Sequence, residues 1–229
     1  MVDVKLDGNA VRYQWGNSTG RYKREGRETF MNTEESKLPS HNSAWEGETG
    51  AIRHLILPFL EGAENVCDIG FGGVRLIPEA IGIDLPHMYN NREHIVTPDI
   101  ACDVREGIPV EDSFFDVCYS SHLIEDFVDT AKMLDEFIRI LKNNGILALA
   151  FPDQKVYESL TPDEVQNRNH VHKDMGLAFM KNVLSTMVKY KFDILLESNC
   201  EPQWLPAQEC FSEHGGYNVV IVAKVQKEF

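Results

Sequence analysis

The chain has 229 residues, of which 43% are hydrophobic and 25% are charged, a length that suits one well-packed domain with accessory segments and is short for two domains. Its formal net charge of −14 argues against an extended nucleic-acid surface, because binding to phosphates depends mainly on Lys and Arg. No run of the sequence approaches the roughly 18 apolar residues of a membrane-spanning helix. The first residues, MVDVKLDGNA, lack the basic-then-apolar order of a secretory signal.

The five cysteines include no C-x-x-C pair that would suggest a zinc site. Cys67, Cys102 and Cys118 fall in apolar runs that we expect to be strands, where a buried, reduced thiol is the simplest interpretation. These features predict a cytoplasmic protein with no membrane partner and no metal. A homo-oligomer is compatible with the composition.

Residues 1–42 have few periodic apolar positions and many Gly, Asn, Ser, Arg and Glu, so we expect an irregular N-terminal extension. The aromatic residues in this segment allow two interpretations. They could cover a pocket as a lid that is ordered when closed, or they could pack on the flank of the domain. The aromatic residues are Tyr13, Trp15, Tyr22 and Phe30.

A helix is predicted over residues 43–60, because Ser43 can cap it, Glu46 follows three positions later, and apolar residues recur at helical spacing. Next comes NVCDIGFGGVRLIPEAIGIDL (residues 65–85), in which an apolar strand runs into a glycine-rich turn. Glycines let a backbone turn sharply and approach a ligand closely. Asp84 ends the following apolar run, where its carboxylate can accept both hydroxyl protons of a ribose. This stretch predicts binding of an adenosine-containing small molecule.

The rest of the chain alternates predicted strands and helices, a pattern typical of a doubly wound sheet. Strands are predicted at 65–70, 80–84, 99–104, 115–120, 145–151, 192–198 and 217–225, and helices at 129–142 and 174–190. The fold class we predict is α/β: a Rossmann-like, mostly parallel sheet with an antiparallel C-terminal strand pair. In such sheets ligands bind beyond the carboxyl ends of the strands.

The order of these motifs resembles class I S-adenosylmethionine-dependent methyltransferases of the small-molecule type. The resemblance rests on DIGFGG and GIDL, on Ile100 to Val104, on FFDVCYSSHLIEDF, and on DTAKMLDEFIRILKNNGILALAFPD. It covers roughly residues 64–226, so we expect residues 43–229 to form a methyltransferase-like domain. It implies S-adenosylmethionine as the cofactor and S-adenosylhomocysteine as the product.

Two positions depart from the family pattern. Only 16 positions separate Asp68 from Asp84, whereas family members usually have a full crossover helix there. Because a parallel crossover generally needs about a dozen residues or more and Pro78 disfavours a helix, we expect a loop or a short 3₁₀ turn. Phe71 stands where the family often has Cys or a small residue. It could pack beside the methionine arm of the cofactor or shield the turn from water.

The resemblance implies a set of cofactor-binding residues at the strand ends. Gly70 and its neighbours would hold the methionine moiety, Asp84 the ribose, and Asp103 the adenine amino group, while Asp68 would orient the glycine turn. The full set is Asp68, Gly70, Phe71, Gly72, Gly73, Asp84, Leu85, Asp103, Val104, Ser120, Ser121 and His122.

Three residues are candidates for proton transfer from the acceptor. His122 follows a strand and has an ordinary pKa near 6.5, although a hydrogen bond to the cofactor is an equal alternative. Asp153 ends the fifth strand, and His170 lies in a segment that also holds Asn169 and His172 and could reach the acceptor. The family often shows Glu-His where this chain has Glu125-Asp126. An alternating His pair on a loop is a weak metal signal, so no metal is expected.

The sequence thus favours a methyltransferase that acts on an unidentified, small-molecule acceptor. The alternative is a cofactor-binding protein without turnover that uses the fold for regulation or assembly. A nicotinamide-linked oxidoreductase is disfavoured, because Arg75 stands where the dinucleotide fingerprint has its third glycine.

Overall fold

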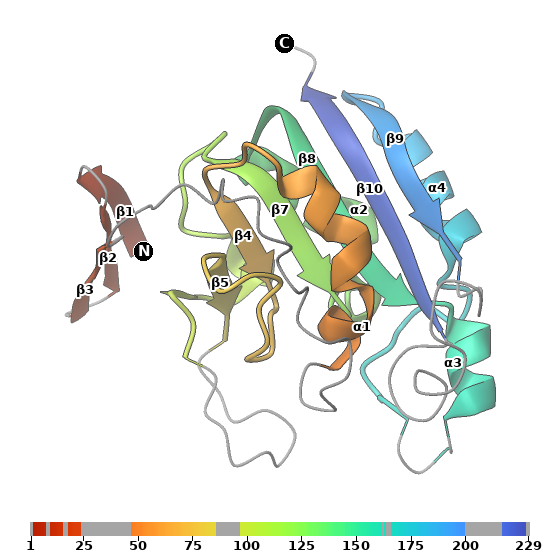
Figure 1. The fold of residues 1–229 in the computed structure, drawn as a ribbon. Helices are drawn as coiled ribbons and strands as arrows, with labels where there is room; N and C mark the ends of the chain where they lie inside the picture. Colours follow the sequence, from red (N-terminus) through yellow and green to blue (C-terminus); the bar gives the residue numbers. More distant parts are fainter. Residues whose placement is uncertain are drawn as a thin grey trace, which may run out of the picture.

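A computed structural model describes residues 2–7, 10–15, 18–23, 47–85, 97–161, 163, 166–199 and 217–227. Its centre is a seven-stranded sheet with the order β6-β5-β4-β7-β8-β10-β9 (Figure 1). The strands are β4 (Val66–Ile69), β5 (Ile81–Asp84), β6 (Ile100–Ala101), β7 (Phe115–Ser121), β8 (Leu141–Pro152), β9 (Tyr190–Ser198) and β10 (Asn218–Lys227). The pairs from β6 to β8 are parallel, and β10 runs antiparallel to both β8 and β9. The predicted fold class is confirmed.

Helices cover both faces of this sheet. On one face α2 (Thr130–Ile140) and α4 (Leu177–Thr186) pack in the larger core, which includes Leu134 and Met180. On the other face α1 (Gly47–Ile56) buries Ile52 and Ile56 against β7, β8 and β10 (Figure 1). The remaining helical elements are η1 (Leu57–Leu60), η2 (Val104–Glu106), η3 (Ile124–Asp126) and α3 (Gln154–Leu160). Among the described residues, no helix has both the length and the apolar character needed to cross a membrane.

The short first crossover contains turns and no helix, as predicted. Its conformation is held by bonds to the sheet and to α1. Asp68 Oδ2 accepts from the backbone N–H of Leu76 at 2.7 Å, and Arg53 donates to the carbonyl of Arg75 at 3.0 Å. The Arg75 guanidinium pairs with Asp99 at 2.6 Å. The crossover is therefore an ordered part of the domain, and it lacks the helix N-terminus that the family usually presents there.

The N-terminal segment differs from its predicted irregular structure. Its backbone forms a three-stranded antiparallel sheet of β1 (Val2–Asp7), β2 (Ala10–Trp15) and β3 (Ser18–Lys23). The expectation was wrong for these residues. In VDVKLD apolar and polar residues alternate with a period of two, which is typical of a strand in spite of the polar composition of the segment. The structure does not describe the aromatic side chains proposed as a lid.

Other boundaries shift by a few residues. The strand expected at 99–104 is only Ile100–Ala101, because Asp103 caps η2 with its side chain. The helix expected at 129–142 is α2, which ends at Ile140, and Asn144 follows it in a left-handed conformation (φ 62°). Helix α3 was not predicted. The Trp204-containing loop lies outside the described residues.

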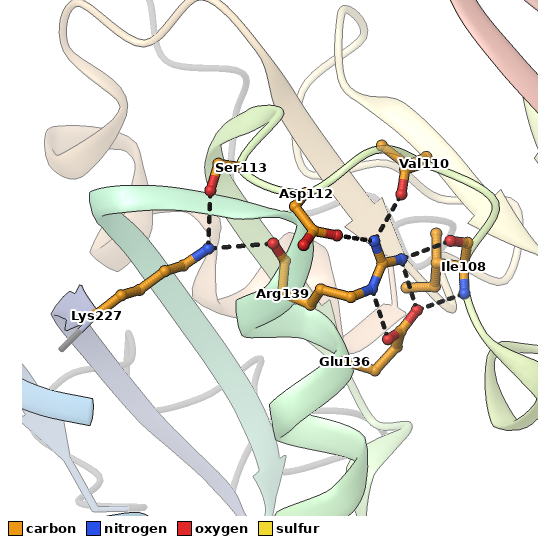
Figure 2. A network of polar contacts seen from close by, with 7 residues as sticks. All are labelled: Ile108, Val110, Asp112, Ser113, Glu136, Arg139 and Lys227. Atoms are coloured by element: carbon orange, nitrogen blue, oxygen red, sulfur yellow. Dashed lines mark hydrogen bonds and ion pairs between the residues drawn. The ribbon is translucent and has the colours of Figure 1, made fainter. Parts of the chain in front are cut away.

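A polar network closes the amino ends of the strands, and Figure 2 shows it. All five N–H groups of the Arg139 guanidinium have an acceptor: Glu136 takes two, and Asp112 and the carbonyls of Ile108 and Val110 take one each. Lys227 of β10 donates to the carbonyl of Arg139 and to Ser113, both at 3.1 Å. We refer to these contacts as the Arg139 network. It ties α2, β10 and the loop before β7 into one unit.

Candidate active site

A cavity of about 720 Å³ lies at the carboxyl ends of the parallel strands, which is within the usual range for small-molecule sites. One wall comes from the ends of β4, β5 and β6 and consists of Gly70, Asp84, Leu85, Cys102, Asp103, Val104 and Arg105. The other wall consists of His122, Leu123, Asp126 and Phe127 after β7, together with Asn167, Arg168, Asn169 and Val171. The two walls meet where the sequence predicted a ligand site.

The glycine turn has the backbone shape that only glycine adopts readily. Gly70, Gly72 and Gly73 have φ values of 71°, 56° and 95°. A Cβ at Gly70 would lie 2.6 Å from Leu123 Cδ2, so the close contact between the β4 and β7 loops also requires glycine. A Cβ at Gly72 would meet nothing within 4 Å. The turn is therefore packed at Gly70 and open at Gly72.

Asp84 links the glycine turn to the end of β5. Its Oδ2 accepts from the Gly72 N–H at 3.0 Å, and its Oδ1 accepts from the Leu85 N–H at 2.6 Å. Both oxygens are thus oriented by backbone donors, and each keeps a second lone pair for a ligand. A carboxylate fixed in this way is suited to accept hydrogen bonds from the two hydroxyls of a ribose.

Asp103 lies on the same wall and is held by Arg105. The Arg105 guanidinium donates to both carboxylate oxygens, with Nη2 2.6 Å from Oδ2, and the Arg105 N–H donates to Oδ1 at 3.0 Å. These hydrogen bonds lower the pKa of Asp103. Asp103 is consequently ionised at neutral pH and able to accept from a ligand amino group.

Several predicted cofactor residues lie behind the cavity wall. Asp68 is fully buried, which raises its pKa to about 7, and it holds the crossover through Leu76. The Phe71 ring packs against Gly82, where a Cβ would lie 2.7 Å from Phe71 Cε1. Ser120 donates to the carbonyl of Ile69 at 2.9 Å. Gly72, Gly73 and Ser121 likewise stand outside the cavity lining.

His122 is part of a buried row of ionisable groups. Glu125 is fully buried, and its Oε1 lies 3.3 Å from His122 Nδ1 and 3.7 Å from His170 Nε2. Two further contacts fix the rings, because His122 Nε2 contacts Asn218 Oδ1 and His170 Nδ1 contacts Gln154 Oε1 at 2.8 Å. We refer to His122, Glu125, Asp126 and His170 as the acidic cluster.

The pKa values of the two imidazoles in the acidic cluster are shifted in opposite directions. Burial would lower the pKa of His122, but Glu125, Glu48 and Asn218 outweigh this and raise it to about 9. Burial lowers the pKa of His170. At neutral pH His122 is therefore a cation paired with Glu125, and His170 is neutral.

Asp126 faces the cavity and was not singled out as a site residue. Its Oδ1 is buried and has no hydrogen-bond partner among the described residues. Burial and the neighbouring charge of Glu125 raise the pKa of Asp126 to about 7, against a smaller opposite effect of His122. The sequence signal was available, since Asp126 stands where the family often has His.

The segment 166–172 closes the cavity over β7. Val171 N–H donates to the carbonyl of Glu125 at 3.1 Å, and Asn167 N–H donates to the Tyr157 hydroxyl at 2.7 Å. Asn169, expected near the acceptor, lines the cavity. His172 lies beside α2, where Nε2 donates to the carbonyl of Phe127 at 2.8 Å.

The third catalytic candidate, Asp153, caps α3. Its Oδ1 accepts from the Val156 N–H at 3.2 Å, and it is not part of the cavity lining. His170 also stands behind the wall, with only 4% of its side chain exposed. Of the three candidates, the structure brings His122 alone into the cavity wall. Among the described residues no group of three His, Cys, Asp or Glu side chains is arranged to hold a metal ion.

Comparisons with known proteins agree with this geometry. Residues 68–149 match the family model of a methyltransferase domain. The chain is similar to an S-adenosylmethionine-dependent methyltransferase structure from Mesorhizobium loti (14% identity, TM-score 0.53, covering 77% of this chain and 97% of that one). It is also similar to a Pyrococcus horikoshii protein (15% identity, TM-score 0.53, covering 81% of this chain and 93% of that one). A third similar structure is a methyltransferase from Thermotoga maritima described as a possible histamine N-methyltransferase (18% identity, TM-score 0.51, covering 75% of this chain and 86% of that one). The comparison with curated proteins finds no match.

These findings confirm the resemblance drawn from the sequence. The matched residues include the glycine turn, Asp84 and the end of β7, and the solved structures share the sheet. Residues 68–149 match a methyltransferase domain, and the chain shares its fold with a solved S-adenosylmethionine-dependent methyltransferase. S-Adenosylmethionine is the cofactor that this family implies, and the acceptor is not identified.

Proposed function

We propose that this protein is a class I methyltransferase that transfers a methyl group from S-adenosylmethionine to a small-molecule acceptor. The observation that carries the proposal is the cavity, which joins the glycine turn and Asp84 on one wall to Asp126 and His122 on the other. Its volume of about 720 Å³ leaves space for an acceptor beside the cofactor. The strongly acidic chain favours small molecules over nucleic acids.

The residues at the strand ends fit this cofactor. We assign Asp84 to the ribose hydroxyls, Asp103 to the adenine amino group, and the backbone of Gly70, which lines the cavity, to the methionine arm. Gly72 orients Asp84 through its N–H, and Gly73 shapes the turn with its positive φ. Leu85 and Val104 supply apolar contacts on the same wall. Asp68, Phe71, Ser120 and Ser121 act from behind the wall by holding the turn and the strand ends in place.

When bound, S-adenosylmethionine supplies an electrophilic methyl group for an in-line displacement. The residues of the chain must align the acceptor and exclude water, because correct orientation provides a large part of the acceleration in such reactions. Asn167, Asn169 and Val171 close the cavity over β7, and the two asparagines offer polar contacts to an acceptor. His122, cationic at neutral pH, is fixed at the wall by Glu125 and Asn218 and contributes its positive charge there.

One observation favours the second candidate, a cofactor-binding protein without turnover. The crossover between β4 and β5 has no helix, so the positive end of a helix dipole does not face the cofactor there. Cofactor binding would then rest on Asp84, Asp103 and the glycine turn. We place this candidate second because the acceptor side of the cavity has its own charged and polar wall.

Titration calorimetry separates a protein that binds S-adenosylmethionine from one that binds a nicotinamide cofactor. We expect S-adenosylmethionine and S-adenosylhomocysteine to bind and NAD to give no heat; binding of NAD alone would contradict the proposal. Incubation of a small-molecule extract with methyl-labelled cofactor then tests turnover. Label in a small molecule supports the enzyme, label in RNA or DNA contradicts the acceptor class, and cofactor binding without transfer favours the second candidate.

We further propose that the protein works in the cytoplasm without a membrane partner. The buried, free Cys67 and Cys118 fit a reducing compartment. A homo-oligomer remains compatible with this function.

A further inference from the structure

The two walls of the cavity stand over different strands. Asp84 ends β5 and Asp126 belongs to η3, directly after β7, while β4 lies between β5 and β7 in the sheet. Neighbouring strands are roughly 4.8 Å apart, so two strand spacings separate the proposed ribose contact from the Asp126 wall. Asp126 therefore stands on the wall farther from the proposed ribose contact, where the cavity has space for an acceptor.

The charges around Asp126 leave it without a positive partner. His122 is the nearest described cation, and its Nδ1 is already 3.3 Å from Glu125. Arg105 is bound to both oxygens of Asp103. Arg168 donates to the carbonyl of Asp163 at 3.3 Å. A carboxyl group with a buried, unpartnered oxygen is costly, and a positively charged ligand would remove this cost.

We propose that Asp126 binds the acceptor of the methyl transfer and that this acceptor carries a protonated amine. The inference rests on the function proposed above. The ammonium group would donate to the Asp126 carboxylate, which lines the cavity and has no partner for its buried Oδ1 among the described residues. Phe127 and Val171, next to Asp126 in the lining, would contact the apolar part of the acceptor.

The same contact explains how the nitrogen becomes a nucleophile. The acceptor ammonium gives one proton to the Asp126 carboxylate, which frees the nitrogen lone pair. The lone pair forms the bond to the methyl carbon, and the electron pair of the broken carbon–sulfur bond stays on sulfur, which becomes a neutral thioether. The product is a methylated ammonium, and Asp126 returns its proton to solvent. A carboxyl group whose pKa is about 7 suits this exchange, because a proton acceptor works best near the operating pH.

The test uses three ligands of similar size and different charge: benzylamine, benzyl alcohol and benzoate. Each is titrated by calorimetry into the full-length protein saturated with S-adenosylhomocysteine, so that binding is measured without turnover. We expect benzylamine to bind at least about ten-fold more tightly than the other two, since a charge-assisted hydrogen bond contributes roughly 1.5–3 kcal/mol. The preference should grow from pH 6 to pH 8 as Asp126 ionises.

Two substitutions of the same kind complete the test. Asp126→Asn keeps the size of the side chain and should abolish the preference for benzylamine. Asp129→Asn is the matched control, because Asp129 only caps α2 by accepting from the Lys132 N–H and asparagine caps equally well; the preference should persist. Equal binding of the three ligands, no binding of benzylamine, or an unchanged preference in Asp126→Asn would overturn the inference.

Failure of the inference differs from failure of the proposed function. If S-adenosylhomocysteine does not bind, the proposed function is wrong. If it binds and the amine preference is absent, only the role of Asp126 is wrong. Thermal melting of Asp126→Asn with and without S-adenosylhomocysteine shows whether the variant is folded.

Discussion

Helix α2 begins beside the acidic cluster and ends in the Arg139 network, and these two groups of charges differ in how their polar atoms are paired. Every N–H of the Arg139 guanidinium has an acceptor, and both oxygens of Glu136 accept. In the acidic cluster, Glu125 Oε2 and Asp126 Oδ1 have no hydrogen-bond partner among the described residues. Satisfied charges hold elements together, whereas unsatisfied buried charges mark places where function outweighs stability.

The difference predicts that substitutions at the two ends of the helix have separable effects. Changes in the Arg139 network should lower the free energy of unfolding and leave ligand affinity alone. Changes of ligand-facing residues at the carboxyl ends of the strands, such as Asp84, should mainly lower ligand affinity.

The largest effect on stability is expected for Arg139→Met. The variant loses five hydrogen bonds and leaves the partly buried Glu136 carboxylate without its cation, so the free energy of unfolding should fall by about 2–4 kcal/mol. Arg139→Lys should fall between wild type and Arg139→Met, because lysine keeps the charge without the planar fork. Urea denaturation measures both. A loss of cofactor affinity in the folded variants would contradict the separation of the two ends.

The reverse effect is expected for Asp84→Ala. Loss of charge-assisted hydrogen bonds worth roughly 1.5–3 kcal/mol each should weaken cofactor binding about ten-fold to a hundred-fold or more. The free energy of unfolding should fall by about 1–2 kcal/mol, since the lost bonds to Gly72 and Leu85 are part-buried and exposed and such bonds contribute about 0.5–1.5 kcal/mol each. Calorimetry gives the affinity, and Asp193→Ala on exposed β9 is the control. Wild-type affinity in folded Asp84→Ala would refute the ribose contact.

A smaller, pH-dependent effect is expected for Glu125→Gln. The pKa of His122 is about 9 in the folded protein and about 6.5 in the unfolded chain. Protonated His122 therefore stabilises the fold fully below pH 6.5, and this stabilisation is lost as the pH rises through 9. The raised pKa values of Asp68 and Asp126, both about 7, make stability fall as the pH rises from about 4 to 7, so most of their pH dependence lies below pH 7.5.

The difference in the free energy of unfolding between wild type and Glu125→Gln should therefore shrink between pH 7.5 and pH 9. Its change should be on the order of 1 kcal/mol. Urea denaturation at the two pH values measures it. An identical pH dependence of the two proteins would show that Glu125 does not hold the proton on His122.

The smallest effect on stability is expected for deletion of residues 1–30. The cooperative melt of the remaining chain should persist, because the described core lies in residues 47–227. Turnover should fall if the aromatic residues of this segment cover the acceptor. A collapse of the melt would show that the segment belongs to the core, and the lid hypothesis would be wrong.

Much of the fold could be predicted because the sequence signals are local. The glycine turn, Asp84 at the end of β5 and the apolar stripe of α2 each lie within a short window. Helix α3 was missed because its seven residues are too few for a clear helical period. The N-terminal strands were missed because the polar composition outweighed their alternation.

The site was predictable only on the cofactor side. Asp84 and Asp103 follow strands and can be placed by topology. Asp126 depends on burial beside Glu125, and Asn167 reaches the cavity through its bond to Tyr157. Such tertiary contacts leave no periodic signal.

The most direct test of the central claim is an experimental structure of the protein with S-adenosylhomocysteine. We expect ribose hydroxyls within hydrogen-bonding distance of Asp84, the adenine amino group beside Asp103, and the sulfur directed at the wall of His122 and Asp126. S-Adenosylhomocysteine bound away from the carboxyl ends of β4, β5 and β6, or with its ribose bonded to another acid, would contradict the claim.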